Sequence, residues 1–588
     1  MKKNNKLIPL LIFAIVSLVY NLPILRNIYY WGQMDWDQFT FWNAVPRETI
    51  LRYHQFPLWN PYGSGGNVML AHPHSSFLSP FYVFVLIFGP IIGVKLEIIL
   101  LLSIGLLGMF FLLRRLGLKE ISAYVGSFIF MLSSVYPLQL TEGHVEWLAM
   151  AFVPWLFLSY LKSIDNNKYV YIAVLFLAVM PLGGGVYISA MMVLFLSLYS
   201  FLMILREKRI VWFKNITIIL AGAFLLSAIK LLPMLEFLSY SPRVIESSEN
   251  ISPLLLPDIL LDRSQGSLYA ETKWNAPDKK AFVSDNLGID YGWHEYGAYV
   301  GIIPLLLFAI GAFFSFKKQW PLFLVGIVFL MLSLGKGSPI NLWKMLHAFP
   351  VYNSLHVPSR LILIFILVLS VFAGLGFSKI EENIEKIYKS RVMVLLIALF
   401  ILFDLYLVGG AILRQAFVIA PMKLKENAEF SQKYNSINFY PKISKSAMYP
   451  IFLSNSGILD AYEVLNVKKG SVFTVEDAEY RGEAYLAGGK GSVMITYFSP
   501  NKVVVNVNAN DRDTLVLNQN YYKGWRVKGD RRRTVAPFNG LIATQVNSID
   551  KTIIFYYRSN SFIIGCIISG ISMLGGLILY AKCSLRNG

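Results

Sequence analysis

The sequence predicts a polytopic α-helical membrane protein that carries a β-rich domain ahead of its last span. Hydrophobic residues make up 55% of the 588 residues and charged residues only 15%, whereas soluble proteins carry about 25% charged residues. Apolar runs long enough to cross a bilayer recur along the chain, and a stretch of alternating apolar and polar residues lies near its end. Together these observations place the chain among multi-pass membrane proteins with an extramembrane domain.

Twelve apolar runs approach the roughly 20 residues that a membrane-spanning helix needs. They lie at 7–25, 91–113, 121–140, 147–162, 169–182, 187–205, 215–235, 298–316, 320–334, 360–378, 392–411 and 561–580. The first run follows MKKNNK without a small-residue cleavage site, so we expect an uncleaved span. The shorter stretch 77–89 contains Pro80 and is expected to lie in the interface, because counting it as a span would place the basic turn 114–120 outside. Both termini are then cytoplasmic.

This topology divides the chain into three parts. Residues 1–411 form the transmembrane domain, with outer segments at 31–90, 141–146, 236–297 and 335–360. Residues 412–560 lie outside, and runs such as KVVVNVNAN and TIIFYYR alternate with a period of two, which predicts a small β-sandwich. Residues 561–588 form the last span and a cytoplasmic tail.

The net charge indicates which binding partners to expect, and the cysteine content indicates whether disulfides stabilise the fold. The formal net charge of +18 suits a bilayer that contains anionic phospholipid, and we do not expect nucleic acid to bind. Only Cys566 and Cys583 are present, so the fold has no disulfide framework. Four ionisable residues fall within the predicted spans, namely Lys95, Glu97, Lys230 and Asp404.

The first outer segment carries two neighbouring aspartates, Asp35 and Asp37. In an extended chain, residues two apart point the same way, so both carboxylates could converge on a sugar hydroxyl or on a divalent cation such as Mg²⁺ or Mn²⁺. A carboxylate in a poorly hydrated cleft can also act as a general base. The alternative is a solvated turn at the membrane interface, where aspartate is common.

Further outer segments carry ionisable groups. Thr141–Glu146 holds Glu142, His144 and Glu146 between two spans, where a polar helix cap is the alternative interpretation. His294 and Glu295 follow the long outer loop, although the aromatic residues around them are also typical of a membrane interface.

An arginine stands at the outer end of a predicted span. Arg360, preceded by His356, is a positive charge on the predicted outer face, against the positive-inside bias. Its guanidinium could bind a phosphate through two hydrogen bonds. The alternative is that its side chain extends to the lipid headgroups. His72 and His74 could ligate a metal, but a metal-free loop is the better interpretation because the sequence places no further ligands.

Several stretches resemble the bacterial YfhO-like membrane proteins, which belong to the GT-C class of glycosyltransferases. QFPLWNPYGSGGNVMLAHPHSSFLSP (55–80) resembles the first-loop signature of that family. HEYGAYVGIIPLLL (294–307), LNQNYYKGWRVKGD (517–530) and FNGLIATQV (538–546) resemble further stretches, and the likeness covers most of the chain. It implies an outer catalytic cleft and a sugar donor linked to polyprenyl phosphate.

The resemblance also implies roles for the carboxylates and for Arg360, and the polar and aromatic residues of the outer segments supply the remaining candidates. The catalytic candidates are Asp35 as the base, Asp37 as its alternate, and Glu142 and Glu146 as assisting carboxylates. Residues expected to bind substrate are His144, His294, Glu295, His356, Arg360, Trp59, Tyr62, His72 and His74. Arg360 would lie near the lipid phosphate. Residues of the outer domain expected to bind the acceptor are Tyr522, Trp525 and Arg532.

The function that follows is transfer of a hexosyl or related group, with inversion, to a cell-envelope glycan outside the plasma membrane. A separate enzyme on the cytoplasmic side would supply the lipid-linked sugar. The alternatives are a flippase or exporter of lipid-linked intermediates and a non-catalytic envelope scaffold. One shared outer cleft for the carboxylates and Arg360 would favour the transferase, whereas scattered positions would favour the scaffold.

Overall fold

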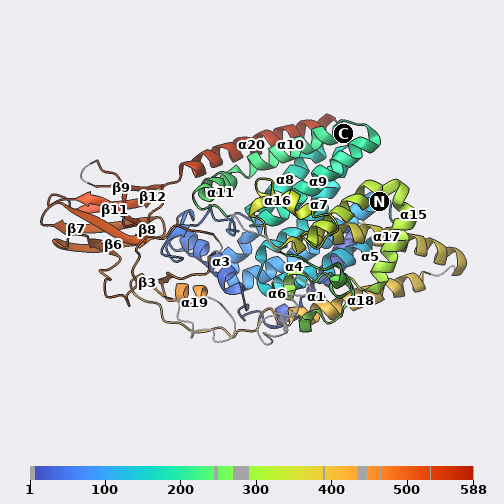
Figure 1. The fold of residues 1–588 in the computed structure, drawn as a ribbon, viewed down its shortest axis with the longest axis horizontal. Coiled ribbons are helices and arrows are strands. Elements are labelled where there is room, and N and C mark those ends of the chain that lie inside the picture. Colours follow the sequence, from blue (N-terminus) through green and yellow to red (C-terminus); the bar gives the residue numbers. More distant parts are fainter. Residues whose placement is uncertain are drawn as a thin grey trace.

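The computed structural model shows an elongated molecule with a helical bundle at one end and a β-sandwich at the other (Figure 1). It describes residues 7–243, 249–268, 291–388, 391–434, 447–463, 465–529 and 532–586. Parts of the predicted outer loop 236–297, at 244–248 and 269–290, therefore lie outside the described residues.

Long apolar helices build the bundle, because a helix satisfies its backbone hydrogen bonds within one segment and so can cross a bilayer. Within the described ranges, eight helices are long and apolar enough to cross a membrane, or nine with one bent pair. The helices of the bundle are α1 (Leu7–Tyr20), α2 (Leu22–Arg26), α4 (Val83–Arg115), α5 (Glu120–Leu132), α6 (Val135–Glu142), α7 (Val153–Ser163), α8 (Lys168–Leu182), α9 (Val186–Glu207), α10 (Val211–Leu226), α11 (Ala228–Tyr240), α15 (Ile302–Ser333), α17 (Ile362–Tyr388), α18 (Val392–Leu413) and α20 (Asn560–Arg586). The polytopic helical fold is thus confirmed.

Helix α15 consists of two antiparallel arms that turn at Gln319. Gln319 leaves the helical region (φ −122°, ψ 19°) two residues before Pro321. A straight helix would separate Phe308 and Phe323 by about 22 Å, yet their ring centroids are 6.1 Å apart. The two arms correspond to the predicted spans 298–316 and 320–334, which explains why one continuous helix accounts for two apolar runs.

Helix α4 is also bent, at Gly89, whose φ of +83° lies in the left-handed region. A Cβ on Gly93 would lie 2.5 Å from the carbonyl oxygen of Phe84, so the segment before Gly89 folds back onto the long helix. The stretch 77–89, predicted to lie in the interface, is accordingly set apart from the span that follows it.

Two buried lysines hold the ends of the first outer loop. Lys95 on α4 and Lys230, just after the 80° bend between α10 and α11, each direct Nζ at three backbone carbonyls. Lys95 donates to the carbonyls of Asn27, Ile28 and Tyr30, and Lys230 to those of Pro73, Ser75 and Pro181. Since unpaired buried ammonium groups are costly, these contacts tie both ends of the loop to the bundle.

Short elements lie around the outer loops. They are α3 (Trp36–Leu51), β1 (Trp59–Asn60), β2 (Asn67–Val68), η2 (Pro80–Tyr82), η3 (Val145–Phe152), η4 (Pro253–Leu255), α12 (Leu256–Leu261), η5 (Trp293–Glu295), α16 (Leu342–His347), η6 (Tyr352–Ser354), η7 (Pro358–Leu361), β3 (Ser431–Lys433), α19 (Met448–Leu453) and β4 (Ser456–Ile458). Part of the segment that follows α18 returns to the first loop. Phe452 of α19 packs on Phe41 of α3, and Ser64 donates its N–H to the Ile458 carbonyl at 2.7 Å.

The C-terminal strands form a β-sandwich of two antiparallel four-stranded sheets with orders β10-β11-β8-β5 and β6-β7-β12-β9. The strands are β5 (Ala484–Leu486), β6 (Gly491–Ser499), β7 (Lys502–Ala509), β8 (Asp513–Asn520), β9 (Trp525–Lys528), β10 (Ala536–Phe538), β11 (Leu541–Val546) and β12 (Thr552–Tyr557). Alternate residues such as Val503, Val505 and Val507 on β7 are buried, as the period of two predicts.

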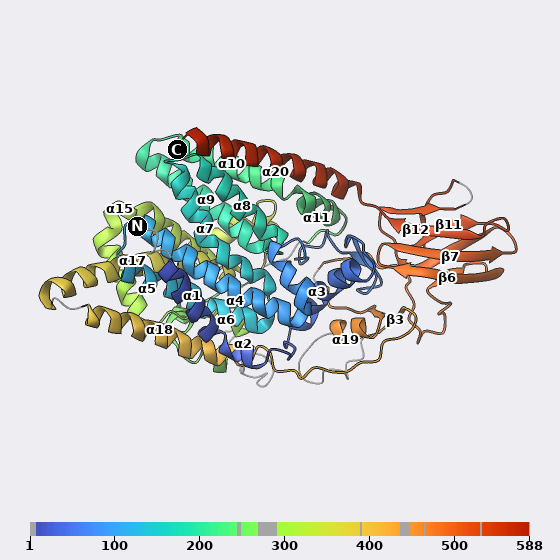
Figure 2. The ribbon, with the colours of Figure 1, turned by 180° about the vertical axis from the view of Figure 1, so that it is seen from behind.

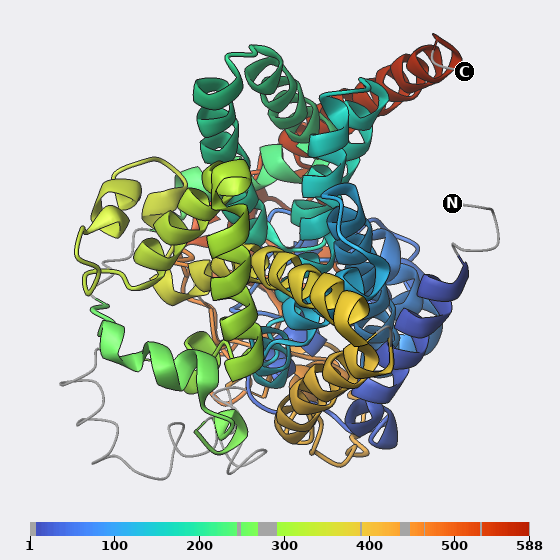
Figure 3. The ribbon, with the colours of Figure 1, turned by 90° about the vertical axis from the view of Figure 1, so that its right-hand side faces the viewer.

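The bundle places α1 and α20 so that α1 begins and α20 ends far from the sandwich (Figure 2). Viewed along the long axis, α20 lies at the edge of the bundle, where it packs against α8, α10 and α11 (Figure 3). The start of α1 and the end of α20 therefore lie toward the same end of the bundle.

Candidate functional site

Four segments that are far apart in the sequence meet beside the start of α3. They contribute Asp35 ahead of α3, the turn 142–146 after α6, the η5 residues His294 and Glu295, and Arg360 of η7. Each comes from a predicted outer segment, so the structure gathers residues that the sequence could only place on the same face.

The turn after α6 fits against α3 because its middle residue is glycine. Gly143 has a φ of +109°, and a Cβ there would lie 2.3 Å from the backbone nitrogen of Trp36. The Asp35 N–H donates to the Glu142 carbonyl at 2.9 Å, and the Trp36 indole N–H donates to the Leu140 carbonyl at 2.7 Å. These contacts fix Asp35 against the second outer segment.

A buried arginine–carboxylate pair lies at the centre of the cluster. Arg360 donates from Nε to Glu295 Oε2 at 2.7 Å and from Nη2 to Glu295 Oε1, and its guanidinium lies over the Tyr187 ring. Gln139 donates from Nε2 to the His294 carbonyl (2.8 Å) and to Glu295 Oε2 (3.3 Å). Burial would raise the pKa of Glu295, but the Arg360 guanidinium holds it well below its usual range, so the pair is ionised.

His144 links this pair to Asp35. Its Nδ1 lies 2.5 Å from Gln139 Oε1 and its Nε2 lies 3.5 Å from Asp35 Oδ2. Burial lowers the pKa of His144, but the Asp35 carboxylate raises it, and the net shift is upward. The Asp35 side chain is 34% exposed and that of His144 only 8%, so Asp35 is the accessible side of the pair.

His294 has a similar arrangement on the other side. Its Nδ1 lies 3.4 Å from Glu142 Oε2 and its Nε2 lies 3.5 Å from Glu295 Oε1. The His294 ring meets the His144 ring edge to face, with centroids 5.4 Å apart. Glu142 and Glu295 therefore lie next to the same imidazole.

The basic side of the cluster contains a second arginine. Arg243 Nη2 lies 3.3 Å from His356 Nδ1, and its buried Nε has no hydrogen-bond partner among the described residues. Burial and the Arg360 guanidinium lower the pKa of Arg243, and the same two causes lower the pKa of His356 to about 3. His356 is thus a neutral acceptor. Two guanidinium groups close enough to repel each other would be stabilised by an anion.

Glu146 also belongs to this cluster, although one of its carboxylate oxygens has no hydrogen-bond partner among the described residues. That oxygen, Oε2, is buried. The charges that act on it most strongly are those of His144 and Arg360. The predicted assisting carboxylate is therefore within electrostatic range of His144 and Arg360.

The structure separates Asp35 from Asp37, contrary to the prediction for an extended chain. Because α3 begins at Trp36, successive side chains turn by about 100° around the helix axis. Residues two apart are therefore rotated by about 200° and lie on nearly opposite faces. The buried Asp37 carboxylate accepts the N–H groups of Met448 (2.8 Å) and Tyr449 (3.0 Å) at the start of α19. Asp37 is thus a structural cap, and the two aspartates do not converge on one sugar hydroxyl or divalent cation, as an extended chain would have allowed.

The two first-loop histidines differ. His72 is buried, stacks on Trp42 at 4.0 Å and lies 3.0 Å from Glu463 through Nε2, so it connects the loop to the segment after α19 instead of meeting substrate. His74 packs on Phe39, which also contacts a histidine of the cluster. Burial, followed by neighbouring cationic groups, lowers the pKa of His74 well below its usual range, and His74 remains a candidate neutral contact at the edge.

The aromatic residues of the PLWNPY motif dock the sandwich, which corrects their prediction as substrate-binding residues. Trp59 is 1% exposed, donates from Nε1 to Gln519 Oε1 at 2.9 Å and packs on Trp525 with centroids 5.5 Å apart. Tyr62 is 2% exposed and packs its ring against two phenylalanines. Neither ring is available to a ligand.

The YYKGW motif lies on the other side of that interface. Trp525 is fully buried, so the prediction that it binds an acceptor is wrong. Tyr522 is half-buried and packs its ring against α11. Asn520 donates from Nδ2 to the carbonyls of Ser64 (2.7 Å) and Gly66 (3.0 Å). Arg532 alone of the three predicted acceptor residues is exposed.

Comparisons with known proteins include a distant structural similarity. No family model and no curated protein matches the sequence. Among solved structures, the cryo-EM structure of the arabinofuranosyltransferase AftD from Mycobacteria matches with a TM-score of 0.40 and 14% sequence identity over 69% of this chain. The match covers 27% of AftD, so the chain spans about a quarter of that protein's length. The site is therefore assigned from its own geometry.

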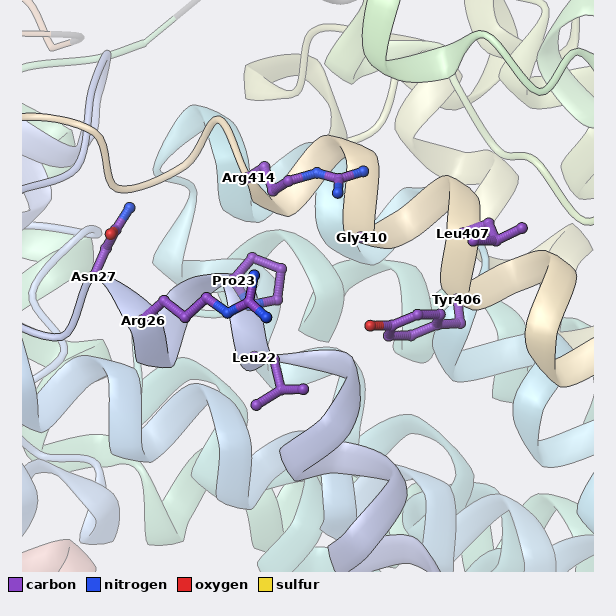
Figure 4. A pocket seen from close by; sticks show the side chains of 8 residues that line it. All are labelled: Leu22, Pro23, Arg26, Asn27, Tyr406, Leu407, Gly410 and Arg414. Atoms are coloured by element: carbon purple, nitrogen blue, oxygen red, sulfur yellow. The ribbon is translucent and has the colours of Figure 1, made fainter.

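A separate cavity of about 180 Å³ lies between α2 and the end of α18. Figure 4 shows the side chains of Arg26 and Arg414 on opposite sides of it, with Asn27 and Tyr406 nearby. None of the cluster residues lines this cavity, so it is not part of the candidate site.

Sequence reasoning missed three residues of the site, namely Gln139, Tyr187 and Arg243. Gln139 is a polar residue inside an apolar run, which is a signal for a function within a span. Arg243 follows a predicted span on the face that the sequence predicts to be outside, which runs against the positive-inside bias. Tyr187 stands in an apolar run with no signal beyond its aromatic ring.

Proposed function

We propose that the protein is a membrane glycosyltransferase of the GT-C type, which moves a sugar from a polyprenyl-phosphate carrier to a cell-envelope glycan outside the plasma membrane. The multi-pass bundle and the resemblance to YfhO-like proteins support this class. The observation that carries the proposal is one cluster in which Asp35 is accessible while His144, Glu295 and Arg360 are buried behind it. A scaffold has no need of such a cluster, because buried ionised groups are costly.

Asp35 is the proposed general base. Sugar transfer from a phosphate needs a base for the acceptor hydroxyl and positive charge at the leaving phosphate. The acceptor oxygen forms its bond to the anomeric carbon as its proton passes to the Asp35 carboxylate. The bond between sugar and phosphate breaks, and its electron pair leaves with the phosphate. Attack from the side opposite the phosphate gives inversion.

Arg360 and Arg243 are proposed to hold the phosphate. Arg360 is oriented by Glu295, and Arg243 keeps a buried Nε without a partner among the described residues. Planar guanidinium groups can fork onto phosphate oxygens, and an anion between two buried arginines relieves their mutual repulsion. Glu146 is proposed to orient the sugar, since it lies near His144 and Arg360.

The acceptor is proposed to be teichoic acid, a polysaccharide or another surface glycan, which the sandwich holds through exposed groups such as Arg532. Both termini would be cytoplasmic, and a separate enzyme on that side would load the lipid carrier. The isoprenoid chain would lie between apolar helices in the bilayer.

The test compares Asp35→Asn with the matched variant Asp37→Asn, because the two substitutions remove the same charge from neighbouring positions. We expect Asp35→Asn to lose sugar transfer by about a hundredfold or more while the protein is still made and folded. Lipid-linked sugar should accumulate and the surface glycan should stay unmodified. Wild-type transfer by Asp35→Asn would refute the assignment, and movement of lipid-linked sugar across vesicles by that variant would favour a flippase.

A further inference from the structure

The spacing of nitrogen and oxygen atoms in the cluster matches that of ligands around a metal ion. His144, His294 and Glu295 each place one ligand atom within 4.8 Å of the others. His144 Nε2 lies 3.5 Å from Asp35 Oδ2, and His294 Nε2 lies 3.5 Å from Glu295 Oε1. Direct hydrogen bonds would be about 2.7–3.2 Å long. Two ligands about 2.0–2.1 Å from a tetrahedral ion are about 3.4 Å apart, which is close to the observed spacing.

His144 has an oxygen at hydrogen-bond distance from Nδ1 and His294 has one slightly farther away, and Nε2 of each ring faces a carboxylate of the cluster. His144 Nδ1 lies 2.5 Å from Gln139 Oε1, and His294 Nδ1 lies 3.4 Å from Glu142 Oε2. Gln139 uses its Nε2 group to donate to Glu295 Oε2, so its oxygen is the atom that faces His144. Metal-binding histidines typically donate from the second ring nitrogen to an oxygen, because this fixes the tautomer and the ring orientation.

The charges of the cluster also fit a divalent cation. Its acidic groups are Asp35, Glu142, Glu146 and Glu295. The arginines among them are Arg360, which is paired with Glu295, and Arg243, which is close enough to repel Arg360. Carboxylates lie next to both imidazoles, with Asp35 beside His144 and Glu142 beside His294. These negatively charged neighbours favour a cation over an anion at the imidazole side of the cluster.

We propose that His144, His294 and Glu295 bind a divalent transition-metal ion, with Asp35 on its accessible side. Two imidazole ligands favour zinc over magnesium, which prefers oxygen ligands and retains water. This site differs from the Asp35–Asp37 pair that the sequence offers as possible ligands, since it draws its ligands from the second and third outer segments. Arg360 then orients the metal ligand Glu295 through its two hydrogen bonds.

Metal binding is tested on the purified full-length protein in detergent, with Zn²⁺, Mn²⁺ and Mg²⁺ as separate probes and no sugar donor present. After dialysis against chelator and reloading, elemental analysis should find about one Zn²⁺ per chain. His144→Gln and His294→Gln should each weaken Zn²⁺ binding more than about tenfold. His54→Gln is the matched control, because His54 is exposed and outside the cluster. Co²⁺ should give the absorption bands of a tetrahedral site.

A measurement on the unmodified protein covers the case in which a histidine variant does not fold. Bound Zn²⁺ should protect His144 and His294, but not His54, from carbethoxylation by diethylpyrocarbonate, as read by mass spectrometry. Substoichiometric Zn²⁺ in the wild type, full binding by both variants, or equal modification with and without Zn²⁺ would overturn the proposal. Protonated histidines that balance the charge without metal would give this negative result. Since sugar transfer is not measured, the outcome is independent of the proposed function.

Discussion

Asp37→Asn provides the most direct test of how the first loop is organised, because it should separate two neighbouring aspartates by function. The Asp37 carboxylate accepts the N–H groups of Met448 and Tyr449 at 2.8 and 3.0 Å and caps α19. A buried hydrogen bond to a charged group contributes about 1.5–3 kcal/mol. Asparagine keeps one acceptor oxygen and turns an NH₂ group toward the other N–H. We therefore expect α19 to be destabilised by about 2–3 kcal/mol, which raises its opening equilibrium about 30- to 150-fold.

Chymotrypsin cleavage after Phe452, followed by mass spectrometry, measures this opening directly. When opening and reclosing are fast, the cleavage rate follows the population of the open form, so the rate should rise by the same factor. Asp35→Asn is the matched control and should leave the rate unchanged, because the Asp35 side chain makes its contacts to His144 and the turn after α6. An unchanged rate in Asp37→Asn, or an equal rise in both variants, would refute the assignment of Asp37 as the cap.

Three further predictions concern the contacts around the site. Asn520→Ala removes two hydrogen bonds to loop carbonyls, costs about 2–4 kcal/mol of docking and should speed hydrogen exchange at residues 63–66; an unchanged exchange rate would contradict it. Gly143→Ala should abolish transfer and destabilise the protein, because the new Cβ would lie 2.3 Å from the Trp36 nitrogen, whereas Gly570→Ala, with no heavy atom within 4 Å, should be neutral. The pKa of Glu295 is lower in the folded protein than in the unfolded chain, where it is about 4.3. The ion pair with Arg360 therefore stabilises the folded protein fully above that pH, and this stabilisation is lost as the pH falls through the lower pKa of the folded state. The thermal midpoint of the wild type should therefore fall more steeply below about pH 4 than that of Glu295→Gln, and parallel curves would argue against the pair.

Hydropathy and periodicity predict the bundle and the sandwich because both signals are local. Each apolar run is helical, although the run 215–235 is divided between α10 and α11 and two runs share α15. Strand β7 alternates as its sequence indicates. The hairpin in α15 follows from Lys317, Lys318 and Gln319, which lie between two apolar runs. The return of α19 to α3 is different, because it depends on contacts such as Phe41 with Phe452, whose residues are over four hundred positions apart in the chain. No periodicity encodes a pairing of that kind.

The candidate site likewise combines residues that the sequence places on one face with contacts that the sequence does not predict. The positive-inside rule brings Asp35, His144, Glu295 and Arg360 to one face, and the structure joins them through contacts of 2.7 to 3.5 Å. The rule cannot tell Asp35 from Asp37, because that distinction depends on where α3 begins. It also cannot find Gln139, whose role is visible only when its amide is seen between His144 and Glu295.

The first outer loop explains how the sandwich and the cluster are connected. Buried lysines on α4 and α11 fix both ends of the loop, and its glycine turn receives Asn520 from the sandwich. The two motifs that most resemble YfhO-like proteins, PLWNPYGSGG and YYKGW, therefore pack against each other and not against a ligand. Their side chains set the position of α3, and with it Asp35, relative to the sandwich. A glycan held on the sandwich would in this way be presented to Asp35 at a defined distance, so changes at the buried Trp59–Trp525 contact should alter transfer without touching any reacting group.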